Sequence, residues 1–145
     1  MARLPSQVSP KSLLHPGFIG AGSTLLIAAL VTDFMYWETS NWQWANSSAW
    51  LIAGGLVLAL VATIVLVIDF LTGRVGRVNW ISFLLVAAAA LLSLVNVFIH
   101  SRDAWTSVVP QGISLSVIVT ILLLMAAAGG WKVTTVRTTA TGDRR

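Results

Sequence analysis

Long stretches without a charged residue alternate with short polar segments along this chain. The uncharged stretches are residues 17–32, 49–68, 80–99 and 112–131. Three of them are close to twenty residues long, and a helix of that length crosses a hydrocarbon core of ~30 Å. The first stretch reaches this length if Asp33 and the three residues after it lie at the interface. The pattern predicts an all-α integral membrane four-helix bundle, a single membrane domain over residues 1–145, with helices at about 16–36, 48–71, 80–100 and 111–131.

Composition supports a membrane protein over a soluble one. Hydrophobic residues make up 57% of the chain and charged residues only 10%, against about 25% charged in soluble domains. The net charge of +4 does not indicate a nucleic-acid partner, because the basic residues lie in short segments beside apolar runs rather than on one water-facing patch. Cysteine is absent, which excludes disulfides, thiolate metal sites and cysteine catalysis. The expected surroundings are therefore the lipid bilayer.

The basic residues predict the orientation of the bundle. If the helices alternate in direction, eight of the nine Lys and Arg residues fall on one side, and only Arg102 falls on the other. The eight are Arg3, Lys11, Arg74, Arg77, Lys132, Arg137, Arg144 and Arg145. Cytoplasmic flanks retain positive charge. We therefore expect a multi-pass protein of the inner (plasma) membrane with both termini in the cytoplasm (N-in/C-in) and a partly mobile tail at 132–145.

Tryptophans and polar residues predict the loops. All seven Trp residues fall near helix ends, as in the aromatic belts of membrane proteins; a binding lid formed by the cluster at 37–50 is the alternative interpretation. Residues 37–48 are expected to form an outer loop with a short interfacial turn. Residues 72–79 are expected to form a tight basic turn on the inner side, where two glycines permit positive φ.

The few ionisable residues predict two polar clusters, one at each membrane surface. On the inner side His15 and Asp69 fall at the same depth, with Asn79 as a candidate third member. On the outer side Asp33 falls at the depth of His100, which shares a helix face with Asn96. These six residues are the candidate binding residues. In a structural interpretation, the pairs hold two helices together, and each pair stabilises the bundle by ~0.6–1.7 kcal/mol. In a functional interpretation, the clusters bind a ligand or carry protons.

No catalytic set is expected among these residues. The polar side chains in the middle of the membrane carry only hydroxyl groups, and no Ser–His–acid set falls at one depth with an evident oxyanion site. No cluster offers three metal ligands. The two histidines lie near opposite surfaces, which excludes a bis-His haem, while a His15–Met125 haem stays open as an alternative. We therefore predict no metal and no cofactor, with haem or quinone as the alternative.

Several short motifs resemble one known family. They are Leu14-His15-Pro16 opening the first helix, Asp33 near its end, Gly54-Gly55 in a second helix that closes at Asp69, Asn96 with Arg102 nearby, and Gly129-Gly130-Trp131. Their order over about residues 14–136 resembles the DUF2231 family of uncharacterised bacterial inner-membrane proteins. The resemblance implies a four-helix membrane protein but no function. Family members often have a histidine where the third helix begins, and this chain has Asn79-Trp80 there. Some relatives accompany membrane redox enzymes, which implies a quinone- or electron-transfer-linked role by analogy.

Two functions follow from these observations. The first is a non-enzymatic structural or accessory subunit, because Gly20-Ala21-Gly22, Gly54-Gly55 and residues 87–90 offer small side chains for close helix packing. Its partner would be another membrane protein or a second copy of the chain. The alternative is a redox-linked quinone- or haem-binding protein that uses the His and Asp clusters at the two surfaces.

Overall fold

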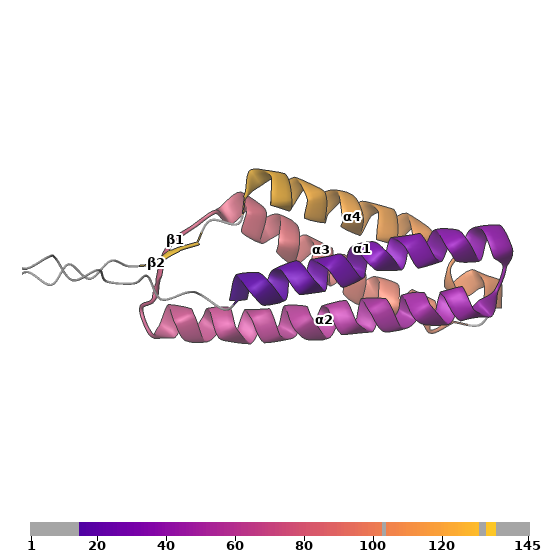
Figure 1. The fold of residues 1–145 in the computed structure, drawn as a ribbon, viewed down its shortest axis with the longest axis horizontal. Coiled ribbons are helices and arrows are strands. Elements are labelled where there is room, and N and C mark those ends of the chain that lie inside the picture. Colours follow the sequence, from indigo (N-terminus) through magenta and orange to yellow (C-terminus); the bar gives the residue numbers. More distant parts are fainter. Residues whose placement is uncertain (1–14, 103, 131–132, 136–145) are drawn as a thin grey trace, which may run out of the picture.

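In the part of the chain that the structure describes, four α-helices run antiparallel to their neighbours in the sequence, and short connections join them in chain order (Figure 1). The computed structural model describes residues 15–102, 104–130 and 133–135. The helices are α1 (His15–Thr39), α2 (Trp42–Leu71), α3 (Trp80–His100) and α4 (Gln111–Gly129). They contain 25, 30, 21 and 19 residues, so each is about 28–45 Å long. All four are long and apolar enough to cross a membrane, and the predicted four-helix bundle is confirmed.

Two helical hairpins make up the bundle. α1 packs along α2, and α3 packs along α4. We name the two ends of the bundle by their acidic residues: the Asp33 end, where α1 is joined to α2 and α3 to α4, and the Asp69 end, where α1 begins and α4 ends. Figure 1 shows the α3–α4 hairpin close to the other hairpin at the Asp33 end and diverging from α2 toward the Asp69 end.

The link between α1 and α2 is shorter than the predicted loop at 37–48. α1 continues to Thr39 and α2 begins at Trp42. Ser40 adopts a positive φ of 51°, and the side chain of Asn41 caps α2 by accepting a hydrogen bond from the Gln43 N–H at 3.0 Å. A polar cap satisfies a free N–H at a helix start, so the polar residues after Asn41 enter the helix instead of forming a loop.

A small β-ribbon closes the Asp69 end. β1 (Val75–Val78) pairs antiparallel with β2 (Val133–Thr135), so the predicted turn at 72–79 contains a strand. The β-branched residues of these segments favour extended backbone. α4 ends at Gly129, two residues before the predicted end, because Gly130 adopts a positive φ of 71°. The predicted mobility of the tail concerns residues that, apart from 133–135, lie outside the described residues.

The core is built from small and branched apolar residues of all four helices. Its buried members are Leu26, Ala29, Ile52, Ala89, Val119 and Leu123. α1 and α2 lie close together at Gly22 and Gly55, where a Cβ added to Gly22 would lie 3.1 Å from the Gly55 carbonyl oxygen. The small residues that the sequence offered for close packing are therefore used within the chain at this crossing.

Candidate functional site

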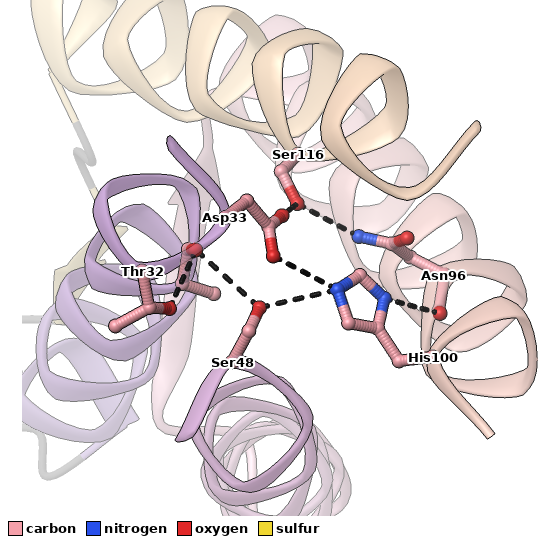
Figure 2. Close-up of polar contacts among 7 residues, drawn as sticks. Thr32, Asp33, Ser48, Asn96, His100 and Ser116 are labelled. Carbon is pink, nitrogen blue, oxygen red and sulfur yellow. Dashed lines mark hydrogen bonds and ion pairs between the residues drawn. The ribbon is translucent and has the colours of Figure 1, made fainter. Parts of the chain in front are cut away.

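A buried polar network joins all four helices at the Asp33 end (Figure 2). α1 contributes Asp33, α2 contributes Ser48, α3 contributes Asn96 and His100, and α4 contributes Ser116. Asp33 and Ser48 are completely buried, and Asn96 and Ser116 are 2% exposed. Figure 2 shows the Asp33 carboxyl between the His100 ring and the Ser116 hydroxyl. The network therefore links the two helical hairpins through one carboxyl group.

His100 uses both ring nitrogens within this network. Its Nδ1 lies 3.0 Å from the Asn96 carbonyl oxygen, which can only accept, so Nδ1 carries a hydrogen. Its Nε2 lies 2.9 Å from Asp33 Oδ1 and 3.2 Å from Ser48 Oγ. A hydrogen bond between Nε2 and the carboxyl needs one hydrogen, which sits on either partner. In both forms Asp33 and His100 together hold one shared proton and have no net charge.

The second carboxyl oxygen of Asp33 fixes the other half of the network. Ser116 donates its hydroxyl to Asp33 Oδ2, and Asn96 Nδ2 donates to Ser116 Oγ at 2.9 Å. Because Ser116 has one hydrogen and gives it to Asp33, it must accept from Asn96, which assigns the orientation of the Asn96 amide. Among the described residues, Asn96 Oδ1 then has no hydrogen-bond partner. The network ends at this buried oxygen.

Pairing explains why a carboxyl can be buried here. An isolated charge in a bilayer is costly, and intramembrane ionisable residues are found paired. The shared proton removes the net charge, while Ser116 and His100 satisfy the two carboxyl oxygens. Each hydrogen bond between membrane helices stabilises the bundle by ~0.6–1.7 kcal/mol. The network therefore acts as a neutral polar clamp.

The clamp brings a serine, a histidine and an aspartate together at one depth. The sequence-based depth estimate missed it because Ser48 was placed at a helix start next to a loop. The geometry differs from that of a hydrolase triad, in which the acid and the serine bind opposite nitrogens of the imidazole. Here both lie at Nε2, while Nδ1 faces a backbone carbonyl. The arrangement does not activate Ser48 as a triad nucleophile.

A second polar cluster lies at the Asp69 end. His15 Nδ1 is 3.3 Å from Asp69 Oδ2, and Arg74 Nη1 is 3.7 Å from Asp69 Oδ1. His15 is completely buried, whereas the Arg74 side chain is 55% exposed. Asn79 belongs to the other hairpin: it caps α3 and donates from Nδ2 to the carbonyl oxygens of Gly129 and Gly130. The structure thus brings His15 and Asp69 together and places Asn79 against the end of α4.

Between the clamp and the Asp69 end lies an apolar cavity of about 620 Å³. It opens between α2 and α3, and its rim residues Val57, Leu60 and Leu91 are 60, 60 and 66% exposed. Small side chains of both helices line it, among them Ala59, Ala62, Ala87 and Ala90. Among its lining residues, all within the described part of the chain, only Ser23 and Thr63 have polar side chains. The cavity suits a hydrocarbon chain.

Sequence reasoning found the ionisable members of both clusters and missed their neutral partners. Asp33, Asn96 and His100 meet as predicted, although the Asn96 side chain is linked to Asp33 through Ser116. Ser48 and Ser116 carry no charge that would mark them in an apolar helix. Counting depth from the Asp33 end would have placed both near Asp33. The cavity has no sequence signal of its own, because it depends on how far the two hairpins diverge.

Comparison with known proteins identifies the family. The family model described as "Predicted membrane protein (DUF2231)" matches residues 11–142. The chain belongs to the DUF2231 family. No curated protein and no solved structure matches the chain. The DUF2231 match covers all four helices and both polar clusters, so the resemblance noted from short motifs is confirmed, and the chain is a membrane protein with four candidate spans.

Proposed function

We propose that this DUF2231 protein is a non-enzymatic membrane protein that holds one membrane lipid by its hydrocarbon chain between α2 and α3. The observation that carries the proposal is the cavity of about 620 Å³ with apolar walls. Its volume falls within the range of about 300–1,000 Å³ typical of small-ligand sites. Burial of an apolar chain against such walls favours binding through close packing.

The lining of the cavity favours a hydrocarbon chain as its occupant. The cavity follows α3 from Phe83 to Leu94, about 16 Å at 1.5 Å per residue. Its walls are almost entirely apolar, with Ser23 and Thr63 as the polar side chains among the lining residues, so they offer few of the hydrogen-bond partners that orient a polar ligand. A hydrocarbon chain enters through the opening between α2 and α3.

The polar clamp supports this proposal by holding the hairpins in place. It joins all four helices at the Asp33 end, while the hairpins diverge toward the Asp69 end (Figure 1). The cavity lies where they diverge. Because the clamp fixes the two hairpins to each other at the Asp33 end, the cavity between them is already formed before a ligand binds. A preformed site lowers the entropy that the protein loses when the ligand binds.

The experiment is native mass spectrometry of the purified protein with its retained lipids. Ala87 and Ala90 line the cavity, and their joint replacement by Phe should fill it. The matched control replaces Ala21 and Ala128, which are exposed and outside the lining, by Phe. We expect a single retained phospholipid in the wild type and the control and none in the cavity variant, with all three proteins folded by circular dichroism.

Two results of this experiment would contradict the proposal. Equal lipid retention by the cavity variant would place the lipid elsewhere on the protein. Extraction of an isoprenoid quinone instead of a phospholipid would favour the redox-linked alternative. His100 gives that alternative little support, because both ring nitrogens are bonded to protein atoms. The accessory-subunit role, its partner, the inner membrane and the cytoplasmic termini stay predictions.

A further inference from the structure

The Asp69 end offers a charged group where the head of a lipid in the cavity would lie. The cavity ends along α2 at Leu66 and along α1 at Ile19. Asp69 follows Leu66 by three residues and His15 precedes Ile19 by four, which places the His15–Asp69 pair about 4–6 Å beyond the cavity along the helix axes. The polar cluster is thus one helical turn past the apolar walls.

The turn after α2 folds Arg74 back onto this cluster. Gly73 adopts a positive φ of 66°, and the Arg74 N–H donates to the Asp69 carbonyl oxygen at 2.9 Å. The guanidinium then lies 3.7 Å from the Asp69 carboxylate, yet the side chain remains 55% exposed. Asp69 orients the arginine while leaving part of its donor fork open to a ligand at the membrane surface.

We propose that the lipid held in the cavity is an anionic phospholipid whose phosphate is bound by Arg74. This inference rests on the proposed function and names the class of its ligand. An arginine fork binds phosphate oxygens with two parallel hydrogen bonds, and basic pockets beside transmembrane helices are typical sites for anionic head groups. A neutral quinone head group carries no negative charge for the guanidinium to bind. A zwitterionic head group carries a cation beside its phosphate, and this cation would repel the guanidinium.

The chain provides a matched control for Arg74. Of the arginine side chains that the structure describes, Arg102 is the one at the Asp33 end, where it is exposed and donates to Gln111 Oε1 at 2.7 Å. Both arginines are near a helix end, and each contacts a polar side chain among the described residues. Of these two, Arg74 lies at the end of the bundle toward which the cavity extends. Replacing either by Gln removes one charge from an exposed position.

The test compares phosphatidylglycerol and phosphatidylcholine with identical acyl chains, added to delipidated protein and measured by native mass spectrometry. We expect the wild type to bind phosphatidylglycerol about fivefold more tightly, the effect of one arginine near an anionic head group. Arg74→Gln should reduce this preference to about one. Arg102→Gln should leave it unchanged, and the Ala87→Phe, Ala90→Phe variant should bind neither lipid.

The outcomes separate this inference from the proposed function. Equal binding of the two lipids by the wild type, lost when the cavity is filled, would overturn the role of Arg74 and leave the cavity as a lipid site. A preference that survives Arg74→Gln would do the same. Absence of binding by either lipid to the wild type would contradict both proposals. Circular dichroism of each variant shows whether the protein is folded.

Discussion

The Nε2 of His100 lies 2.9 Å from Oδ1 of Asp33, 67 positions earlier in the chain. This contact joins α3 to α1, and neither side chain is exposed. Around it, Ser48 and Ser116 bring in α2 and α4. One buried pair with a shared proton thus determines how the two hairpins meet, and several of its properties can be measured.

Replacement of Asp33 should show whether His100 needs a negatively charged partner or only a polar one. In Asp33→Ala, the Ser116 hydroxyl loses its acceptor and His100 Nε2 keeps only Ser48, and a buried polar group left unsatisfied costs about 1–3 kcal/mol. In Asp33→Asn, the amide can donate to a neutral Nε2 and accept from Ser116, so the loss should be below about 1 kcal/mol. Unfolding free energies in detergent check this order.

Glu38 provides the control for this comparison. It is an exposed carboxylate near the same end of α1, and Glu38→Ala should change the unfolding free energy by less than about 0.5 kcal/mol. A loss in Asp33→Asn as large as that in Asp33→Ala would show that His100 is held as a cation and needs a negative partner.

Gly112 allows the clamp to be disturbed without any change of charge. A Cβ at this position would lie 2.8 Å from His100 Cε1 and 2.9 Å from the Ser107 carbonyl oxygen. Gly112→Ala should therefore displace the imidazole and cost about 1–3 kcal/mol. Gly20→Ala is the matched control, because nothing lies within 4 Å of its added Cβ, and it should stabilise the helix by about 0.5–1 kcal/mol. Similar melting temperatures for the two variants would contradict the contact.

The charged and ionisable members of the clamp could be predicted from the sequence, whereas its neutral members could not. Asp33 and His100 interrupt or end apolar segments, so their depth could be counted, and Asn96 shares a helix face with His100. Ser48 and Ser116 are equally buried but neutral, and nothing in an apolar helix separates them from serines that bond to their own helix, as Ser93 does to the Ala89 carbonyl. The cap by Asn41 was also missed, because polar residues at 37–48 favoured a loop.

The packing of the helices against one another could not be predicted from the sequence for a different reason. The sequence offered small residues on several helices, but only packing decides which of them meet. Gly22 and Gly55 do meet, whereas Ala87 and Ala90 line the open cavity. Helical periodicity shows which residues share a face of one helix, but it does not determine the angle between two hairpins. The cavity therefore could not be predicted.

The crossing of α1 and α2 gives a test by coupling. A Cβ on Gly55 would lie 2.7 Å from Cγ and 2.8 Å from Cδ2 of Leu26. Gly55→Ala should cost about 1–3 kcal/mol through overpacking, and Leu26→Ala about 2–5 kcal/mol through loss of packing. The double variant should be more stable than the sum of the two losses implies, because the smaller residue 26 leaves room for the new methyl group. Strict additivity would show that the two residues do not touch.

The orientation can be tested with single cysteines, since the chain has none. Thr72 lies at the Asp69 end and Ser101 at the Asp33 end, and both are exposed. If the flanks rich in Lys and Arg stay in the cytoplasm, a membrane-impermeant maleimide should label Ser101→Cys in intact cells. Thr72→Cys should be labelled only after permeabilisation. The reverse labelling pattern would indicate the opposite orientation, with both termini outside the cytoplasm. Arg74 would then face the outer leaflet, which lacks the negative surface potential of the cytoplasmic leaflet.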